Sequence, residues 1–153
     1  MMRSATPITI VLADDDAEDC AMAREVLEGC SIANDLRIVS DGTELLDYLH
    51  RRGRYADPAS APRPGAILMD LNLPGKDCRA VVADIRADPA LRSIPVVVLT
   101  ASRVEEEVVR TFNLGAASFI TKPITIAGLF DALRPVRKHR PEIIECPETI
   151  HRG

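Results

Sequence analysis

Five short apolar runs, separated by stretches of helical periodicity, constrain the fold of this 153-residue chain more than any other feature. The runs are rich in Val, Ile and Leu, and they cover residues 8–13, 36–40, 66–70, 94–100 and 118–121. Continuous apolar runs are typical of strands buried on both faces of a parallel sheet. The sequence therefore predicts an α/β fold: a doubly wound, five-stranded parallel sheet with helices on both faces.

The segments between the runs have the periodicity of amphipathic helices. A helix over about residues 17–29 is expected to bury Met22, Val26 and Leu27. Asp41, followed three residues later by Glu44, indicates a capped helix start. Residues 52–65 are rich in Pro and Gly and are predicted to form a loop. The other helical faces expected to be buried are Leu45, Leu46 and Leu49; Val81, Val82 and Ile85; Val104, Val108, Val109 and Phe112; and Leu129, Phe130 and Leu133.

Length and charge narrow the classes of protein. We expect one domain over residues 1–137 and a polar tail over 138–153, which is too short for an output domain. The net charge of −4 is unlike that of nucleic-acid-binding domains, which are usually basic. No apolar run approaches the roughly 20 residues of a membrane span, and the first residues do not resemble a secretory signal. The sequence thus predicts a cytoplasmic protein that binds neither nucleic acid nor membrane.

The four cysteines, Cys20, Cys30, Cys78 and Cys146, form no C-x-x-C pair, and the three histidines are isolated. This spacing does not fit a zinc site. The spacing does not exclude a magnesium site, because magnesium prefers carboxylate oxygens as ligands.

Polar residues follow the predicted strands where each strand ends. Asp14, Asp15 and Asp16 follow the first strand, Asp70 ends the third, Thr100 ends the fourth, and Lys122 follows the last. The carboxyl ends of parallel strands share one edge of a sheet, where ligands bind in this class of fold. Converging carboxylates repel one another unless a cation lies between them, and an ammonium and a hydroxyl suit a phosphate. Together these groups indicate a phosphoryl-transfer site, with Asp70 as a possible nucleophile.

Four motifs carry a family resemblance: IVLADDD, ILMDLNLPGKD, VVVLTAS and FITKP. Over residues 8–134 the chain resembles the receiver domain of two-component response regulators. The resemblance implies the flavodoxin-like strand order 2-1-3-4-5. It also implies a single-domain response regulator that accepts a phosphoryl group from a histidine kinase in a magnesium-dependent reaction. Such a protein catalyses its own phosphorylation and dephosphorylation but is not an ordinary enzyme.

The resemblance also assigns roles to individual residues. Asp70 is the phosphoacceptor, and the Mg²⁺ ligands come from Asp14, Asp15, Asp70 and the backbone carbonyl of Asn72. Thr100 and Lys122 contact the phosphoryl group. The switch residues are Thr100 and Phe119.

Cys78 departs from the family pattern, because receivers usually carry Gly there. A backbone with positive φ would strain a cysteine, so we expect an ordinary backbone conformation at this position.

Finer resemblance, in the long loop before the third strand and in TASRVEEEVVRTFNLGAASFITKP, is to receivers that partner bacterial phytochrome histidine kinases. It implies a kinase of that type as partner. It also implies a homodimer through the helix 4–strand 5–helix 5 face, over residues 104–114, 118–121 and 129–136.

Two other functions fit parts of the pattern. A haloacid-dehalogenase-like phosphatase would use Asp14 as nucleophile and Asp16 as its partner, but Glu18 stands where that family usually has Thr or Val. The second alternative is a phosphate sink or intermediate phosphorelay carrier without an output of its own. It would use the same residues as the signalling receiver.

Overall fold

Every strand of the sheet runs parallel to its neighbours, in the order β2-β1-β3-β4-β5. The computed structural model describes residues 8–29, 34–101, 118–122, 124–125 and 127–128. The strands are β1 (Ile8–Ala13), β2 (Asn34–Val39), β3 (Ala66–Asp70), β4 (Val96–Thr100) and β5 (Ser118–Thr121). The helices are α1 (Ala17–Glu28), α2 (Gly42–His50) and α3 (Cys78–Ala87), with short 3-10 helices η1 (Gly53–Tyr55) and η2 (Pro58–Ser60). The predicted fold class and strand order are confirmed.

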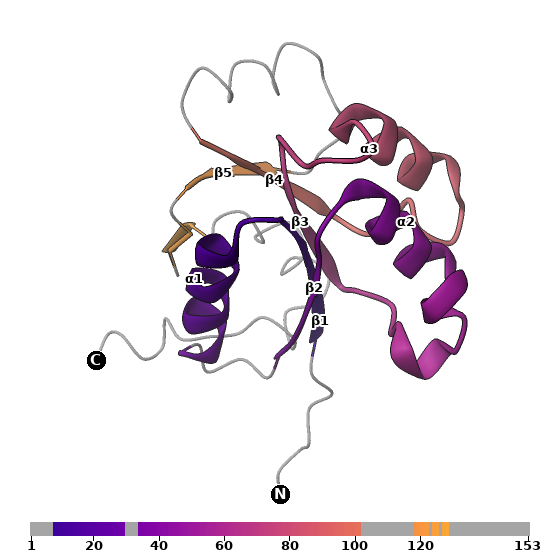
Figure 1. Cartoon of the computed structure of the whole chain (residues 1–153), viewed down its shortest axis with the longest axis horizontal. Helices are drawn as coiled ribbons and strands as arrows, with labels where there is room; N and C mark the ends of the chain where they lie inside the picture. Colours follow the sequence, from indigo (N-terminus) through magenta and orange to yellow (C-terminus); the bar gives the residue numbers. More distant parts are fainter. Residues whose placement is uncertain (1–7, 30–33, 102–117, 123, 126, 129–153) are drawn as a thin grey trace, which may run out of the picture.

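Helices cover both faces of the sheet: α1 lies on one face, and α2 and α3 lie on the other (Figure 1). Successive strand residues point to opposite faces, so β1 directs Ile10 and Leu12 toward α1 and directs Val11 and Ala13 toward α2 and α3. The central strands β1, β3 and β4 are buried along their whole length. The continuous apolar runs in the sequence therefore reflect burial on both faces.

Helix α1 packs on the sheet through Val26 and Leu27, as predicted, but with Ala23 in place of Met22. Ala23 and Leu27 are its buried residues, and Val26 is half-buried against the same cluster. Met22 is 43% exposed, so its prediction as a core residue is wrong. A small alanine at position 23 lets the helix approach the sheet closely, and Met22 is rotated by about 100° from that contact.

Helix α2 begins where the sequence predicts. The Asp41 carboxylate accepts a hydrogen bond from the backbone N–H of Glu44 at 2.7 Å, as an N-cap residue does. The Glu44 carboxylate accepts from the N–H of Ser40, at 2.9 Å, rather than from that of Asp41. β2 ends at Val39, one residue before its predicted end.

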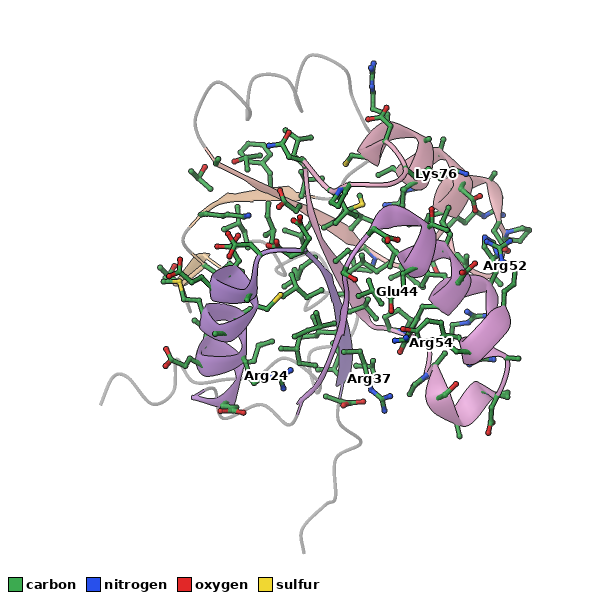
Figure 2. The ribbon with its side chains drawn as sticks, viewed as in Figure 1. Arg24, Arg37, Glu44, Arg52, Arg54 and Lys76 are labelled. Atoms are coloured by element: carbon green, nitrogen blue, oxygen red, sulfur yellow. The ribbon has the colours of Figure 1, made fainter. Side chains whose placement is uncertain are left out.

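The proline-rich loop contains more order than its sequence suggests. Tyr55 from η1 is buried, and its ring lies 5.2 Å from the ring of Tyr48 on α2, between centroids. The Tyr55 hydroxyl donates to Glu44, which also pairs with Arg54 (Figure 2). The segment therefore packs on α2, away from the strand ends that carry Asp70.

The strand boundaries differ slightly from the predicted ones. β2 begins at Asn34 rather than at 36, where it pairs with Ile8 at the start of β1. β4 begins at Val96 rather than at 94, although the Pro95 carbonyl still accepts a hydrogen bond from Ile67. Proline has no N–H to donate to a ladder.

Several predictions fall outside the described residues. They are the helix over 104–112, the helix with Leu129, Phe130 and Leu133, and the tail over 138–153. The division into a domain over 1–137 and a tail also stays a prediction.

The loop from β3 to α3 leaves the strand end and packs against the start of α2. Gly75 adopts a φ of +88°, which favours glycine, and the Gly42 N–H donates to the Pro74 carbonyl at 3.1 Å. A Cβ atom on Gly42 would lie only 2.9 Å from the Cβ atom and the carbonyl oxygen of Lys76. The lack of a side chain at Gly42 thus allows this loop to lie against α2.

We expect Gly42→Ala to lower the free energy of unfolding by about 1–3 kcal/mol, since the backbone at Lys76 would have to move. The measurement is urea unfolding followed by circular dichroism. Gly29→Ala is the matched control, because its Cβ atom would meet only ordinary contacts, the nearest at 3.4 Å. Equal stabilities of the two variants would contradict the tight approach at Gly42.

Candidate functional site

The candidate site lies at the carboxyl edge of the sheet. Asp14 directly follows β1, Asp70 and Thr100 are the last residues of β3 and β4, and Lys122 directly follows β5. The strands are in parallel register, with Asp70 opposite Leu99 and Thr100 opposite Thr121. The predicted convergence of polar residues at one edge is confirmed.

Three carboxylates form an acidic cluster: Asp14, Asp15 and Asp70 each offer an oxygen, all within 4.8 Å of one another. Asp14 and Asp70 are buried, whereas Asp15 is exposed. At an effective dielectric constant of 20, two charges at that separation repel by about 3 kcal/mol. A positive charge close to the three carboxylates would therefore stabilise the cluster.

Backbone geometry fixes the directions of these side chains. The Asp14 N–H continues the ladder by donating to the Val39 carbonyl at 3.0 Å, and one Asp14 oxygen accepts from the Asp16 N–H at 2.9 Å. Asp16 caps α1 by accepting from the N–H groups of Glu18 and Asp19. The chain thus turns from strand to helix directly after the acidic pair.

Asp14 is the most deeply buried carboxylate of the cluster, with 1% of its surface exposed. Burial raises its pKa to about 6, although the hydrogen bond from Asp16 and the charge of Lys122 act in the opposite direction. Its Oδ2 atom is buried and makes no hydrogen bond to any described residue, while the Lys122 ammonium lies 3.3 Å away. A buried oxygen with unused acceptor capacity, beside two more carboxylates, fits the hard-oxygen donor set of a divalent cation.

Lys122 supplies the positive charge within the described residues. Its Nζ atom donates hydrogen bonds to Asp19 and, at 3.1 Å, to Oδ2 of Asp70. Burial acts to lower the pKa of Lys122, but the hydrogen bonds to Asp19 and Asp70 outweigh it and the pKa rises. The ammonium is therefore charged at neutral pH.

Asp70 is held from two sides. One of its oxygens accepts from the Asn72 N–H at 3.0 Å, and the other accepts from Lys122. Its side chain is only 11% exposed. A reacting group can therefore approach this carboxylate only along a restricted direction.

Thr100 is fully buried, and its hydroxyl faces β5. Its Oγ1 atom lies 3.5 Å from the Ile120 carbonyl and 3.4 Å from the Thr121 hydroxyl. Phe119, which precedes Ile120 on β5, is half-buried against the core beneath α2 and α3. The structure brings the two predicted switch residues onto neighbouring strands, but their switching role stays a prediction, as does the ligand role of the Asn72 carbonyl.

Asp19 was missed in the sequence. It lies in the first turn of α1, and its carboxylate contacts Lys122 across a separation of 103 residues in the chain. Its place in the first turn of α1, directly after the end of β1, would have put it near the same edge.

Cys78 has an ordinary backbone, as expected: Arg51 is the one non-glycine residue with positive φ in the described ranges. Cys78 is the first residue of α3 and is buried, and burial raises the pKa of its thiol to about 11. The thiol is therefore protonated at neutral pH and unreactive.

The parallel order 2-1-3-4-5 with an acidic cluster, a threonine and a lysine at its carboxyl edge defines a receiver-type α/β domain. Residues 10–134 match the family model of the response regulator receiver domain, and the chain belongs to this family. The chain is a response regulator receiver, and it is not an ordinary enzyme. Receivers bind a divalent metal, which agrees with the acidic cluster.

Relatives at similar length include phytochrome response regulators. The chain is 36% identical to response regulator Rcp1 of Synechocystis sp. over 145 residues, which cover 95% of this chain and 97% of Rcp1. The structure of the bacteriophytochrome response regulator AtBRR matches with a TM-score of 0.78 at 36% identity, covering 86% of this chain and 94% of AtBRR. The phosphorylated cyanobacterial phytochrome response regulator RcpA matches with a TM-score of 0.71 at 34% identity, over 93% and 99%. A structure of Rcp1 is of its Mn²⁺-bound form, with a TM-score of 0.69 at 36% identity, over 92% and 99%.

Among the helices in the described ranges, none is long and apolar enough to cross a membrane.

Magnesium is expected to stabilise the folded chain through the acidic cluster. At a free concentration about 100 times the dissociation constant, a ligand that binds only the folded state adds about 2.7 kcal/mol. We expect Asp15→Asn to remove most of the resulting rise in Tm, because the Asp15 carboxylate has no hydrogen-bond or ion-pair partner among the described residues and is available to a cation. Asp14→Asn should have a smaller effect, since Asp14 already shares the charge of Lys122.

The measurement is thermal unfolding with Mg²⁺ and with EDTA. Asp16→Asn is the control, because asparagine also caps helices and Asp16 is not part of the cluster. Equal shifts for the wild type and for Asp15→Asn would place the cation elsewhere.

Proposed function

We propose that Asp70 accepts a phosphoryl group from a phosphohistidine of a histidine kinase, in a Mg²⁺-dependent reaction. A carboxylate oxygen of Asp70 attacks the phosphorus atom and forms a P–O bond. The P–N bond to the donor imidazole breaks, and its electron pair stays on the imidazole nitrogen. Attack of water on the phosphorus later returns inorganic phosphate and the free carboxylate.

The observation that carries the proposal is the setting of the Asp70 carboxylate. It ends the third and central strand, lies within the acidic cluster, and has an ammonium 3.1 Å from its Oδ2 atom. Phosphoryl transfer depends mainly on positioning and on neutralising charge on the phosphoryl oxygens. The site offers both to an acceptor at Asp70.

The residues of the site would have different roles in phosphoryl transfer. Asp14, Asp15, Asp70 and the Asn72 carbonyl would hold Mg²⁺, which when bound neutralises charge on the phosphoryl oxygens. Lys122 would pair with one phosphoryl oxygen and Thr100 would donate its hydroxyl to another. The alternative phosphatase would instead need Asp14 as nucleophile, which its burial disfavours.

The switch would start from the buried Thr100 hydroxyl. Turning this hydroxyl from the Ile120 carbonyl toward a phosphoryl group on Asp70 would vacate space beside β5. The ring of Phe119 could then repack into that space, which gives two arrangements of one surface. Phenylalanine has no hydroxyl, so this rotamer change would depend on packing alone.

A bacterial phytochrome histidine kinase is the partner that we propose, in the cytoplasm. The similarity to AtBRR and RcpA, which are named as phytochrome response regulators, supports this assignment. We also propose a homodimer through the helix 4–strand 5–helix 5 face, of which β5 alone falls in the described ranges.

We expect Asp70→Asn to abolish transfer of labelled phosphate from an autophosphorylated histidine kinase, because asparagine lacks the nucleophilic oxygen anion. Label on the chain is followed by gel electrophoresis, with Mg²⁺ and with EDTA. Asp77→Asn is the matched control: Asp77 lies in the loop that follows Asp70, its side chain is exposed, and it makes no capping hydrogen bond. Substantial label on the folded Asp70→Asn variant would assign the nucleophile to another residue.

Phosphorylation should also change self-association or kinase affinity, if the face around β5 is the output. Beryllofluoride, a mimic of the bound phosphoryl group, allows this to be measured by light scattering and by calorimetric titration of the kinase. We expect at least one of these quantities to shift in the wild type and neither to shift in Asp70→Asn. If neither quantity shifted while beryllofluoride occupied Asp70, the chain would act as a phosphate sink.

A further inference from the structure

The ammonium of Lys122 has a third carboxylate partner, Asp19, which belongs neither to the acidic cluster nor to the metal ligands that we propose. Asp19 lies in the first turn of α1, and its Oδ2 atom accepts a hydrogen bond from Nζ of Lys122. This contact is the shortest of the three that Lys122 makes with carboxylates. Both side chains are about one-fifth exposed, so the pair lies at the rim of the site.

Three carboxylates lie close to the Lys122 ammonium: those of Asp14, Asp19 and Asp70. The Lys122 ammonium has three N–H groups, and it donates to Asp19 and Asp70 while lying 3.3 Å from Oδ2 of Asp14 without a hydrogen bond. Asp19 therefore holds the ammonium toward α1. Without Asp19, its remaining carboxylate partners among the described residues would be Asp14 and Asp70, whose oxygens a cation and a phosphoryl group need.

We propose that Asp19 is a positioning residue for phosphoryl transfer: it holds the Lys122 ammonium at the rim of the site and limits how closely the ammonium pairs with Asp70 and Asp14. This inference rests on the proposed function. One N–H of Lys122 stays on Asp19, and the N–H that now faces Asp70 can pass to an oxygen of the incoming phosphoryl group. Asp70 then attacks with an oxygen that is not locked in an ion pair.

The test replaces the carboxylate of Asp19 with an amide. Asp19→Asn should slow phosphorylation by phosphoramidate, a small phosphoryl donor, about tenfold in the presence of Mg²⁺, because a mispositioned group costs rate without any change in the chemistry. The rate is followed by ³¹P NMR. Glu18→Gln is the matched control: it removes one negative charge from the neighbouring residue, and Glu18 makes no side-chain contact with Lys122 among the described residues. Its rate should stay within twofold of the wild type.

A second readout separates positioning from charge. The chain has only three lysines, Lys76, Lys122 and Lys138, so lysine-selective ¹³C labelling gives few signals, and Lys122→Met assigns that of Lys122. A fixed side chain gives two distinct Hε shifts, which should merge in Asp19→Asn and stay distinct in Glu18→Gln. Circular dichroism checks that each variant is folded, and Asp19→Ser, which also suits a first helical turn, provides a second replacement.

The outcomes are distinguishable. A wild type that phosphoramidate does not phosphorylate at Asp70 would overturn the proposed function and this inference with it. A phosphorylated wild type with equal rates in Asp19→Asn and Glu18→Gln would overturn the inference alone. The same holds for a slower Asp19→Asn with unchanged Lys122 signals, which would mean that Asp19 acts only through its charge. A faster Asp19→Asn would mean that Asp19 competes with the phosphoryl group for Lys122, and would also overturn it.

Discussion

The ammonium of Lys122 is the interaction on which the site depends. Asp14 and Asp70 bring negative charges within 4.8 Å of each other in a buried setting, and Lys122 lies 3.1–3.3 Å from an oxygen of each. Removing one partner from a buried ion pair leaves an uncompensated charge, which typically destabilises a protein by about 3–5 kcal/mol. The burial of Asp14 at 1% exposure is tolerable because Lys122 is present, and the raised pKa of Asp14 shows that the compensation is incomplete. The remaining negative charge at Asp14 and Asp70 therefore favours the binding of a further cation.

The parallel sheet is the constraint that brings these groups together. Asp14 and Lys122 are far apart in the sequence, yet parallel strands place their carboxyl ends at one edge, so the ends of β1, β3, β4 and β5 bring the functional residues together there. Backbone hydrogen bonds then refine the positions: the Lys122 N–H donates to the Thr100 carbonyl at 2.8 Å, and the Asp14 N–H donates to Val39. A few side chains are enough to form the site, because the backbone already fixes the position from which each one extends.

The sequence predicted what depends on local pattern and failed where a contact is tertiary. The strands, the Asp41 cap and the acidic edge follow from apolar runs, capping chemistry and strand ends, and the structure confirms them. Met22 was wrong because apolar character alone does not show which helix face a small residue such as Ala23 will draw to the sheet. The burial of Tyr55 and the ion pair between Asp19 and Lys122 depend on partners distant in the chain, and no local periodicity encodes them. Asp70 was proposed as a nucleophile from its place at a strand end, whereas the switch role of Thr100 came from the family resemblance.

A short chain of hydrogen bonds connects Asp70 to β5, so a change of charge at Asp70 can affect the surface around this strand. Lys122 is bonded through its side chain to Asp70 and through its N–H to the Thr100 carbonyl, and the Thr100 hydroxyl faces the Ile120 carbonyl on β5. Two residues therefore join the proposed phosphoryl acceptor to the strand that carries Phe119. The same lysine is also bonded to α1 through Asp19. If Asp19 keeps its hold when the phosphoryl group arrives, the movement falls on Thr100 and β5 rather than on α1. The direction of the switch then follows from which of the partners of Lys122 is the most firmly bound.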